Sequence, residues 1–171
     1  APTLEQAVHS PAREARFVAR DPIRHPLAAL QFFGLRPDAS VVEIWPGGGY
    51  WTQILGPYLH DRGIYTLALG PEDGAGSAFS KMLLTHPELK ETFRTTQFDD
   101  KNLAFAPADS ADFVLTFRNL HNWMEAGTTQ QMLAAIHRVL KPGGIFGVED
   151  HRGHTKAKQD PRAEDGDVRQ S

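Results

Sequence analysis

The sequence predicts a single α/β domain with a doubly wound, mainly parallel β-sheet and helices on both faces. Two features favour this fold. From Ser40 onward, short apolar runs of strand length alternate with stretches of helical periodicity. Three consecutive glycines follow the first of these runs, at the place where open α/β sheets bind their ligands. At 171 residues, the chain is long enough for one domain with a sizeable core and too short for two.

Five short apolar segments are expected to be the strands of this sheet. The fourth has the strongest strand composition, because its run Phe-Val-Leu-Thr-Phe combines aromatic, β-branched and aliphatic residues. The third is the weakest. In chain order, the expected strands cover residues 41–45, 64–69, 93–98, 113–117 and 145–148.

Helical periodicity marks the segments between and before these strands. The first expected helix is polar and is interrupted by Pro11, and Gly34 is placed to end the second. The last one is strongly amphipathic and stops at the sequence Lys-Pro-Gly-Gly. The expected helices cover residues 4–19, 26–33, 50–59, 78–85 and 128–140.

Three regions are expected along the chain. Residues 1–34 form a helical extension that folds over the sheet as a lid. Residues 35–151 form the core domain. Residues 152–171 are a polar tail, or the start of a part that the sequence lacks. The chain begins with Ala1, which indicates either processing or trimming.

Composition excludes several classes of function. The formal net charge is -3, so no overall basic field attracts nucleic acid or an anionic membrane. No apolar run reaches the roughly 20 residues of a membrane-spanning helix. The chain has no cysteine, which excludes disulfides, thiolate metal sites and cysteine nucleophiles. A small-molecule substrate is the expected partner, and the sequence defines no oligomeric state.

The glycine-rich turn after the first strand is the strongest functional signal. Glycines at this place let the backbone approach a ligand and adopt positive φ angles. A dinucleotide-binding fingerprint fails because its third glycine is replaced by Thr52, and a phosphate-binding loop fails because no Gly-Lys-Ser/Thr follows. A tight turn without a ligand is the other alternative. The turn consists of Pro46, Gly47, Gly48 and Gly49.

From this turn onward the chain resembles the class I, Rossmann-like S-adenosylmethionine (SAM) methyltransferases. The sequence from Glu43 to Gly49, Glu-Ile-Trp-Pro-Gly-Gly-Gly, is similar to their motif I. Asp112-Phe-Val-Leu resembles their fourth strand, and residues 137–146 resemble their last helix, turn and fifth strand. The resemblance covers about residues 35–150. Residues 24–27 together with 42–52 are similar to a narrower group of bacterial predicted methyltransferases of unassigned substrate.

The resemblance implies that SAM is the cofactor and that residues 35–151 bind it. The glycine turn would pass under the methionine part, and Glu43 would contact the amino group or support the loop. Asp99 would accept a hydrogen bond from the adenine amino group, with Phe98 or Asp100 beside the ring. The transferring methyl group would be bordered by the residues that end the fourth strand, namely Phe117, Arg118 and Asn119.

The sequence departs from the family in three places. Trp45 replaces the first glycine of motif I. The acid that binds the ribose hydroxyls should fall near Ala68, so Glu72 or Asp73 is the expected substitute. The antiparallel hairpin that usually follows the fifth strand has no counterpart in the sequence. The missing ribose acid favours, as an alternative, a SAM- or nucleoside-binding module without catalysis.

His121 is the expected general base, because it lies just beyond the fourth strand and histidine titrates near neutral pH. Asn119 is expected to orient the acceptor. Each of these residues has a purely structural alternative, namely tethering the loop or closing the turn. Arg24 is expected either to meet the SAM carboxylate or to be solvated. Residues 149–154 contain acids and histidines, but their spacing matches no metal motif, so no metal site is predicted.

The sequence therefore predicts a SAM-dependent methyltransferase that acts on an unidentified small-molecule acceptor. The alternatives are the non-catalytic binding module and, with less support, an NAD-linked oxidoreductase. A cytoplasmic location is the default because SAM is found there, and export to the periplasm is the alternative that Ala1 suggests.

Overall fold

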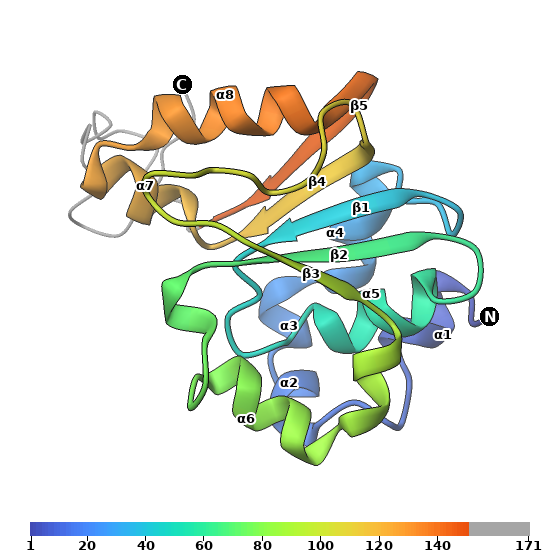
Figure 1. Cartoon of the computed structure of the whole chain (residues 1–171). Coiled ribbons are helices and arrows are strands. Elements are labelled where there is room, and N and C mark those ends of the chain that lie inside the picture. The colour runs from blue at the N-terminus through green and yellow to red at the C-terminus, as the bar shows by residue number, and fades with distance from the viewer. Residues whose placement is uncertain (151–171) are drawn as a thin grey trace, which may run out of the picture.

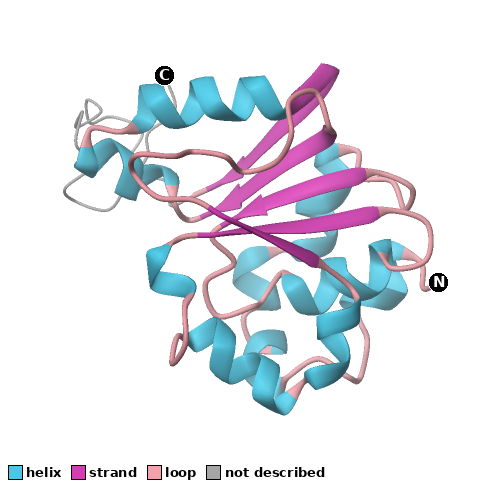
Figure 2. Ribbon diagram, viewed as in Figure 1, coloured by secondary structure: helices cyan, strands magenta, loops and turns pink. Residues whose placement is uncertain are grey.

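A computed structural model describes residues 1–150 of the chain as one α/β domain (Figures 1 and 2). Five strands form one all-parallel sheet in the order β3-β2-β1-β4-β5. The predicted doubly wound, Rossmann-like fold is confirmed. Strand order reverses between β1 and β4, so their carboxyl ends flank the switch point. The strands are β1 (Ser40–Ile44), β2 (Ile64–Leu69), β3 (Arg94–Gln97), β4 (Ala111–Phe117) and β5 (Leu140–Glu149).

The start of β5 differs from the prediction. The Lys-Pro-Gly-Gly sequence was expected to be a turn before the strand, but it lies within β5. It forms an irregularity in which pairing shifts from Ala111 with Leu140 to Phe113 with Ile145. Gly143 has φ of +80°, a conformation that glycine adopts without a Cβ penalty. The glycine therefore bends the strand rather than preceding it.

The amino-terminal region forms four short helices. The expected helix over residues 4–19, interrupted by Pro11, is instead two separate short helices, and between them the Ser10 hydroxyl accepts the backbone N–H of Ala12. Proline also has no N–H to continue the helical ladder. Asp21–Arg24 was not predicted to be helical. The helices are α1 (Leu4–Val8), α2 (Ala15–Val18), α3 (Asp21–Arg24) and α4 (Pro26–Phe33).

The remaining helices cover both faces of the sheet. In Figure 1, α8 lies over β4 and β5 on one face, and α4 and α5 lie on the opposite face. The segment of α7, which was expected to be a loop, is a short helix in which only Trp123 is buried. The helices are α5 (Thr52–Leu59), α6 (Ala78–Thr85), α7 (Leu120–Ala126) and α8 (Thr129–Val139), with 3₁₀ turns at Pro71–Asp73 and Pro87–Glu91.

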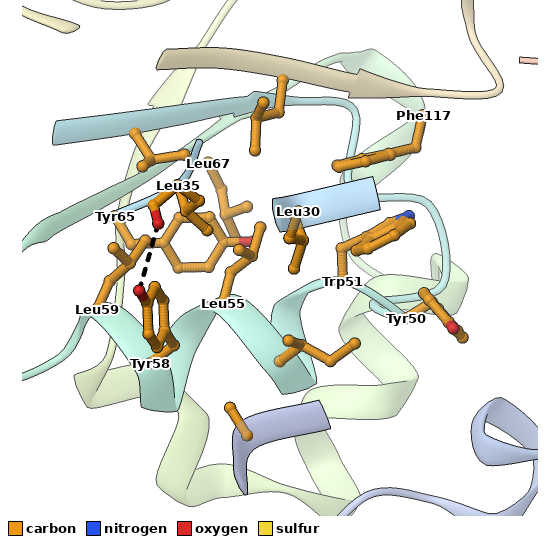
Figure 3. Close-up of a cluster of buried hydrophobic side chains, with 14 of the residues drawn as sticks. Leu30, Leu35, Tyr50, Trp51, Leu55, Tyr58, Leu59, Tyr65, Leu67 and Phe117 are labelled. Carbon is orange, nitrogen blue, oxygen red and sulfur yellow. Dashed lines mark hydrogen bonds between the residues drawn. The ribbon is translucent and has the colours of Figure 1, made fainter. Parts of the chain in front are cut away.

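Two hydrophobic clusters form the core, one on each face. Side chains of β1 alternate between them, since Val41 belongs to the cluster under α5 and Val42 to the cluster under α8. Figure 3 shows the first cluster, where Trp51 stacks on Phe117 with ring centroids 4.0 Å apart. This packing fixes the start of α5 against the end of β4, directly beneath the glycine turn.

Within residues 1–150, no helix combines the length and apolarity needed to cross a bilayer. The predicted polar region 152–171 and the question of a carboxyl-terminal hairpin lie outside the described residues. The same holds for His151 and His154 of the acidic and histidine-rich sequence.

Candidate functional site

The glycine turn lies at the switch point, between the carboxyl ends of β1 and β4. Gly49 has φ of +93°, and a Cβ there would lie 2.3 Å from Cε of Met82, so this glycine also allows α6 to pack closely. Gly47 has φ of +58° and nothing within 4 Å of an added Cβ. Gly47 therefore presents its backbone to open space, as expected of a residue that a ligand approaches.

Two cavities meet at this turn and share the lining residues Trp45, Gly47 and Asn119. The first has a volume of about 420 Å³ and lies under the amino-terminal helices. The second has a volume of about 440 Å³ and lies between the segment after β2 and helix α7. Both are within the range of small-molecule sites. The predicted turn residues Pro46 and Gly48 also line the first cavity.

Glu43 lines the first cavity from the end of β1, although its side chain is directed into the core. The residue is 1% exposed and its carboxylate accepts a hydrogen bond from the Tyr65 hydroxyl. Burial raises the pKa of Glu43 to about 8, and the nearby charge of Asp73 adds to the shift. At pH 7 the carboxyl group is therefore mostly protonated until a cation approaches it.

The three residues that were expected to border the methyl group, Phe117, Arg118 and Asn119, all line the first cavity. Phe117 stacks on Trp51, and the backbone N–H of Arg118 donates to the carbonyl of Glu149 at 2.6 Å. The Asn119 amide donates to the Ile44 carbonyl at 3.2 Å and to Thr116 Oγ1 at 2.9 Å. Asn119 thus ties the end of β1 to the end of β4 while facing both cavities.

The second cavity is lined by the two acids that were expected to substitute for the ribose-binding acid of the family. Ala68 is fully buried within β2, whereas Glu72 and Asp73 line the cavity from the 3₁₀ turn that follows. One Asp73 oxygen accepts the backbone N–H of Gly70 at 2.9 Å, and burial raises the pKa of Asp73. The two acids therefore lie a few residues beyond Ala68, the position where the resemblance places the ribose-binding acid, in the 3₁₀ turn after β2.

Trp45, which stands where motif I has its first glycine, has an unusual backbone conformation. Its φ is +57°, a conformation that glycine adopts without strain but that is rare for a bulky residue, and strained positions of this kind cluster at functional sites. The indole packs so closely on Gly70 that a Cβ there would lie 2.0 Å from Nε1. Among the described residues, this buried Nε1 donor has no hydrogen-bond partner.

The residues predicted to hold adenine are less well assembled. Phe98 is buried against Phe105, with ring centroids 4.8 Å apart, and leans on the Trp45 ring at 5.8 Å. The Asp99 carboxylate accepts the backbone N–H groups of Lys101 and Asn102 and so closes its own turn. Asp99 and Asp100 are exposed and lie outside the described lining of both cavities.

His121 is paired with Asp150 across the carboxyl edge of the sheet. Nδ1 of His121 lies 2.8 Å from Oδ1 of Asp150, and the other carboxylate oxygen accepts the backbone N–H of His121 at 2.9 Å. The Asp150 side chain is 4% exposed. This pair joins the start of α7 to the end of β5. It fixes the orientation of the imidazole one residue before Asn122, which lines the second cavity.

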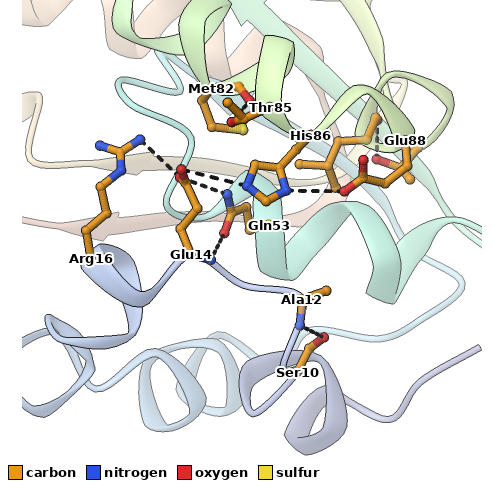
Figure 4. Close-up of polar contacts among 11 residues, drawn as sticks. Ser10, Ala12, Glu14, Arg16, Gln53, Met82, Thr85, His86 and Glu88 are labelled. Carbon is orange, nitrogen blue, oxygen red and sulfur yellow. Dashed lines mark hydrogen bonds and ion pairs between the residues drawn. The ribbon is translucent and has the colours of Figure 1, made fainter.

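The amino-terminal helices supply cavity residues that sequence reasoning did not assign. Arg16, Phe17 and Arg20 line the first cavity together with Arg24. Figure 4 shows how Glu14 holds this segment: its carboxylate pairs with Arg16 at 3.0 Å and accepts the side-chain amide of Gln53 in α5 at 3.2 Å. The signal in the sequence was the recurrence of arginine every three or four residues between positions 13 and 24.

Residues 46–148 match a family model described as a methyltransferase domain. No curated protein matches the sequence significantly.

Among solved structures, a SAM-dependent methyltransferase from Aquifex aeolicus is 16% identical, with a TM-score of 0.64, and the match covers 95% of this chain and 81% of that one. A glycopeptide N-methyltransferase, MtfA, complexed with SAM is 23% identical, with a TM-score of 0.50 and 70% and 51% coverage. Coclaurine N-methyltransferase bound to S-adenosylhomocysteine (SAH) is 11% identical, with a TM-score of 0.54 and 81% and 37% coverage. The match thus spans about half or less of the last two proteins, and at these identities the likeness is one of fold.

Proposed function

Because this chain belongs to the methyltransferase domain family, we propose that it transfers a methyl group from SAM to a small-molecule acceptor. The observation that carries the proposal is the junction of two cavities at the Gly47 backbone, at the switch point of the sheet. SAM supplies a methyl group that is bonded to a sulfonium sulfur. A nucleophile of the acceptor forms a bond to this methyl carbon as the carbon–sulfur bond breaks and its electron pair returns to the sulfur. We also propose that the chain belongs to the narrower group of bacterial predicted methyltransferases of unassigned substrate that its sequence resembles.

The residues present fit this cofactor. The first cavity would hold the methionine part, with the Gly47 backbone below it and Glu43 close to its ammonium group. The second cavity would hold the nucleoside, where Glu72 and Asp73 offer carboxylates to the ribose hydroxyls. The buried Nε1 of Trp45, which lines both cavities, is a donor that a ligand could satisfy. An adenine contact from Asp99 requires that its turn rearrange.

Binding and turnover test this proposal in two steps. Isothermal titration of the chain with SAM and with SAH should give binding to a single site, whereas NAD should give none. Formation of SAH in the presence of a panel of small oxygen and nitrogen nucleophiles then tests catalysis. Binding without turnover would favour the non-catalytic module that the alanine at position 68 suggested. Absence of SAM and SAH binding to a folded chain would contradict the proposal.

Gly47→Ala is expected to weaken SAH binding about tenfold or more, because the added Cβ would intrude on the shared wall of both cavities and 1.4 kcal/mol corresponds to a factor of ten. Gly34→Ala is the matched control. Gly34 also has positive φ, at +76°, and nothing within 4 Å of an added Cβ, but it ends α4 away from the cavities.

Both glycine variants should lose similar stability, about 1–2 kcal/mol from left-handed strain. Only Gly47→Ala should lose affinity in a calorimetric titration with SAH. Equal affinities in the two variants would show that the turn serves the fold alone.

His121 is proposed as the general base that removes the acceptor's proton, with Asp150 as the positioning residue for its ring. Once an acceptor is found, His121→Ala is expected to lower kcat about a hundredfold without changing the SAH dissociation constant. Asp150→Asn should shift the pH profile of kcat, since it changes the charge beside the imidazole. An unchanged kcat in His121→Ala would remove this residue from the chemistry.

A further inference from the structure

The acid that the resemblance assigns to the adenine amino group, Asp99, is turned to its own backbone. Its Oδ1 accepts the backbone N–H groups of Lys101 and Asn102, both at 2.9 Å, and the backbones of Asp99 and Asn102 also pair with each other. Asp99 is exposed and lies outside the described lining of both cavities. A base in the second cavity therefore needs another partner for its amino group.

Helix α7 supplies a polar wall of the second cavity. Three residues at spacings of three and four line it: Asn119, directly before α7, and Asn122 and Ala126 within it. Residues at these spacings share one face of a helix. Glu72 and Asp73 line the same cavity from the segment after β2. A ligand there meets carboxylates from one segment and carboxamides from the other.

The two carboxamides differ in the hydrogen bonds that they have left to offer. Asn119 Nδ2 donates to the Ile44 carbonyl at 3.2 Å and to Thr116 Oγ1 at 2.9 Å, so both of its N–H groups are used. The exposed side chain of Asn122 makes no hydrogen bond within residues 1–150. Asn122 can therefore both donate and accept, whereas Asn119 can only accept.

The backbone on both sides of Asn122 is held in place. Asp150 accepts the backbone N–H of His121 at 2.9 Å and lies 2.8 Å from its ring nitrogen Nδ1. Trp123 is 1% exposed and belongs to the hydrophobic cluster under α8. Ligand binding therefore has to order only the Asn122 side chain, which keeps the entropic cost of the contact low.

We propose that Asn122, and not Asp99, reads the adenine base of the cofactor. Its carboxamide accepts a hydrogen bond from the amino group of the base and donates one to the neighbouring ring nitrogen. A carboxamide matches this adjacent donor and acceptor, which is how asparagine and glutamine read adenine in nucleic acids. The inference rests on the proposed function, which places the nucleoside in the second cavity.

The test is a thermodynamic cycle between one side chain and one group of the ligand. Isothermal titration compares SAH with its 6-deamino analogue, in which hydrogen replaces the amino group of the base. The wild type is expected to bind SAH about five- to tenfold tighter than the analogue, as one neutral hydrogen bond predicts. Asn122→Ala should weaken SAH binding by at least this factor and bind the two ligands almost equally.

Glu125→Ala is the matched control on the same helix, because Glu125 is exposed and lies outside the described lining of both cavities. It should keep the wild-type affinity and preference. Asp99→Ala should keep the preference as well, since its carboxylate serves its own turn. Asn122 is exposed and makes no hydrogen bond within residues 1–150, so Asn122→Ala is expected to fold with wild-type stability.

Three outcomes would overturn the proposal. They are equal binding of SAH and its analogue by the wild type, an unchanged preference in Asn122→Ala, and loss of the preference in Asp99→Ala. Failure of the proposed function is a separate result, because the folded wild type would then bind neither ligand.

Discussion

Glu43→Gln is expected to stabilise the chain above pH 8 and to leave its stability nearly unchanged near pH 4. The wild-type carboxyl has a pKa of about 8 when folded, against 4.5 for an unperturbed glutamate. The folded state therefore holds this proton more tightly than the unfolded state. The free energy of unfolding of the wild type falls by up to about 5 kcal/mol as pH rises from about 4.5 to 8, and then levels off. Glutamine has nearly the same shape but does not ionise.

Urea unfolding of both proteins at pH 4, 7 and 9 measures this difference. Glu91→Gln, which removes a carboxyl from an exposed position, is the control and is expected to change little. A Glu43→Gln variant no more stable than the wild type at pH 9 would show that the buried carboxyl ionises without a penalty.

The same residue links stability to the proposed cofactor. If the SAM ammonium lies close to Glu43, binding at pH 7 should release a proton, because a nearby cation favours the carboxylate. Titrations in buffers of different ionisation enthalpy would measure that release. Glu43→Gln should bind SAM more weakly and release no proton at this site.

Asp21→Ala is expected to lower the free energy of unfolding by about 3–5 kcal/mol, the usual effect of removing one partner of a buried ion pair. The Arg13 side chain is 1% exposed and pairs with both Asp21 oxygens, at 2.8 and 2.9 Å. The Tyr50 hydroxyl also donates to Asp21. Without this carboxylate, the buried guanidinium loses its counter-charge, and the amino-terminal segment loses its link to Tyr50 beside the glycine turn.

Asp38→Ala is the matched control for this prediction. Asp38 also pairs with an arginine, Arg36, at 3.4 Å, but both side chains are more than half exposed. Surface pairs of this kind contribute about 0–1 kcal/mol. In thermal or urea unfolding, Asp21→Ala should therefore lose clearly more free energy of unfolding than Asp38→Ala. Similar losses in the two variants would show that the ion pair of Arg13 and Asp21 does not anchor the amino-terminal segment.

The pH dependence of the Asp21 pair has the opposite sign to that of Glu43. Hydrogen bonds from Arg13 and Tyr50 outweigh desolvation and lower the pKa of Asp21. The stabilising contribution is therefore fully present above the unfolded value, about 3.9, and is lost as pH falls through the lower folded pKa. The wild type should lose more stability than Asp21→Ala in this acidic range.

The fold class and the position of the glycine turn could be predicted from local patterns in the amino-acid sequence. Strand composition and helical periodicity are local properties, so the amphipathic α8 and the strands, apart from the start of β5, could be placed within a few residues. A glycine-rich turn after a buried strand likewise identifies a ligand-facing backbone, because few other residues adopt its conformation.

Which side chains meet at the site could not be predicted from the sequence, because it depends on how the elements pack. The pairing of His121 with Asp150 and the convergence of amino-terminal arginines on the glycine turn join residues far apart in the chain. The sequence also did not predict that the Glu43 side chain is directed into the core or that the Asp99 carboxylate closes its own turn. Such contacts depend on strand order and packing, whereas sequence periodicity records only which face of an element is buried.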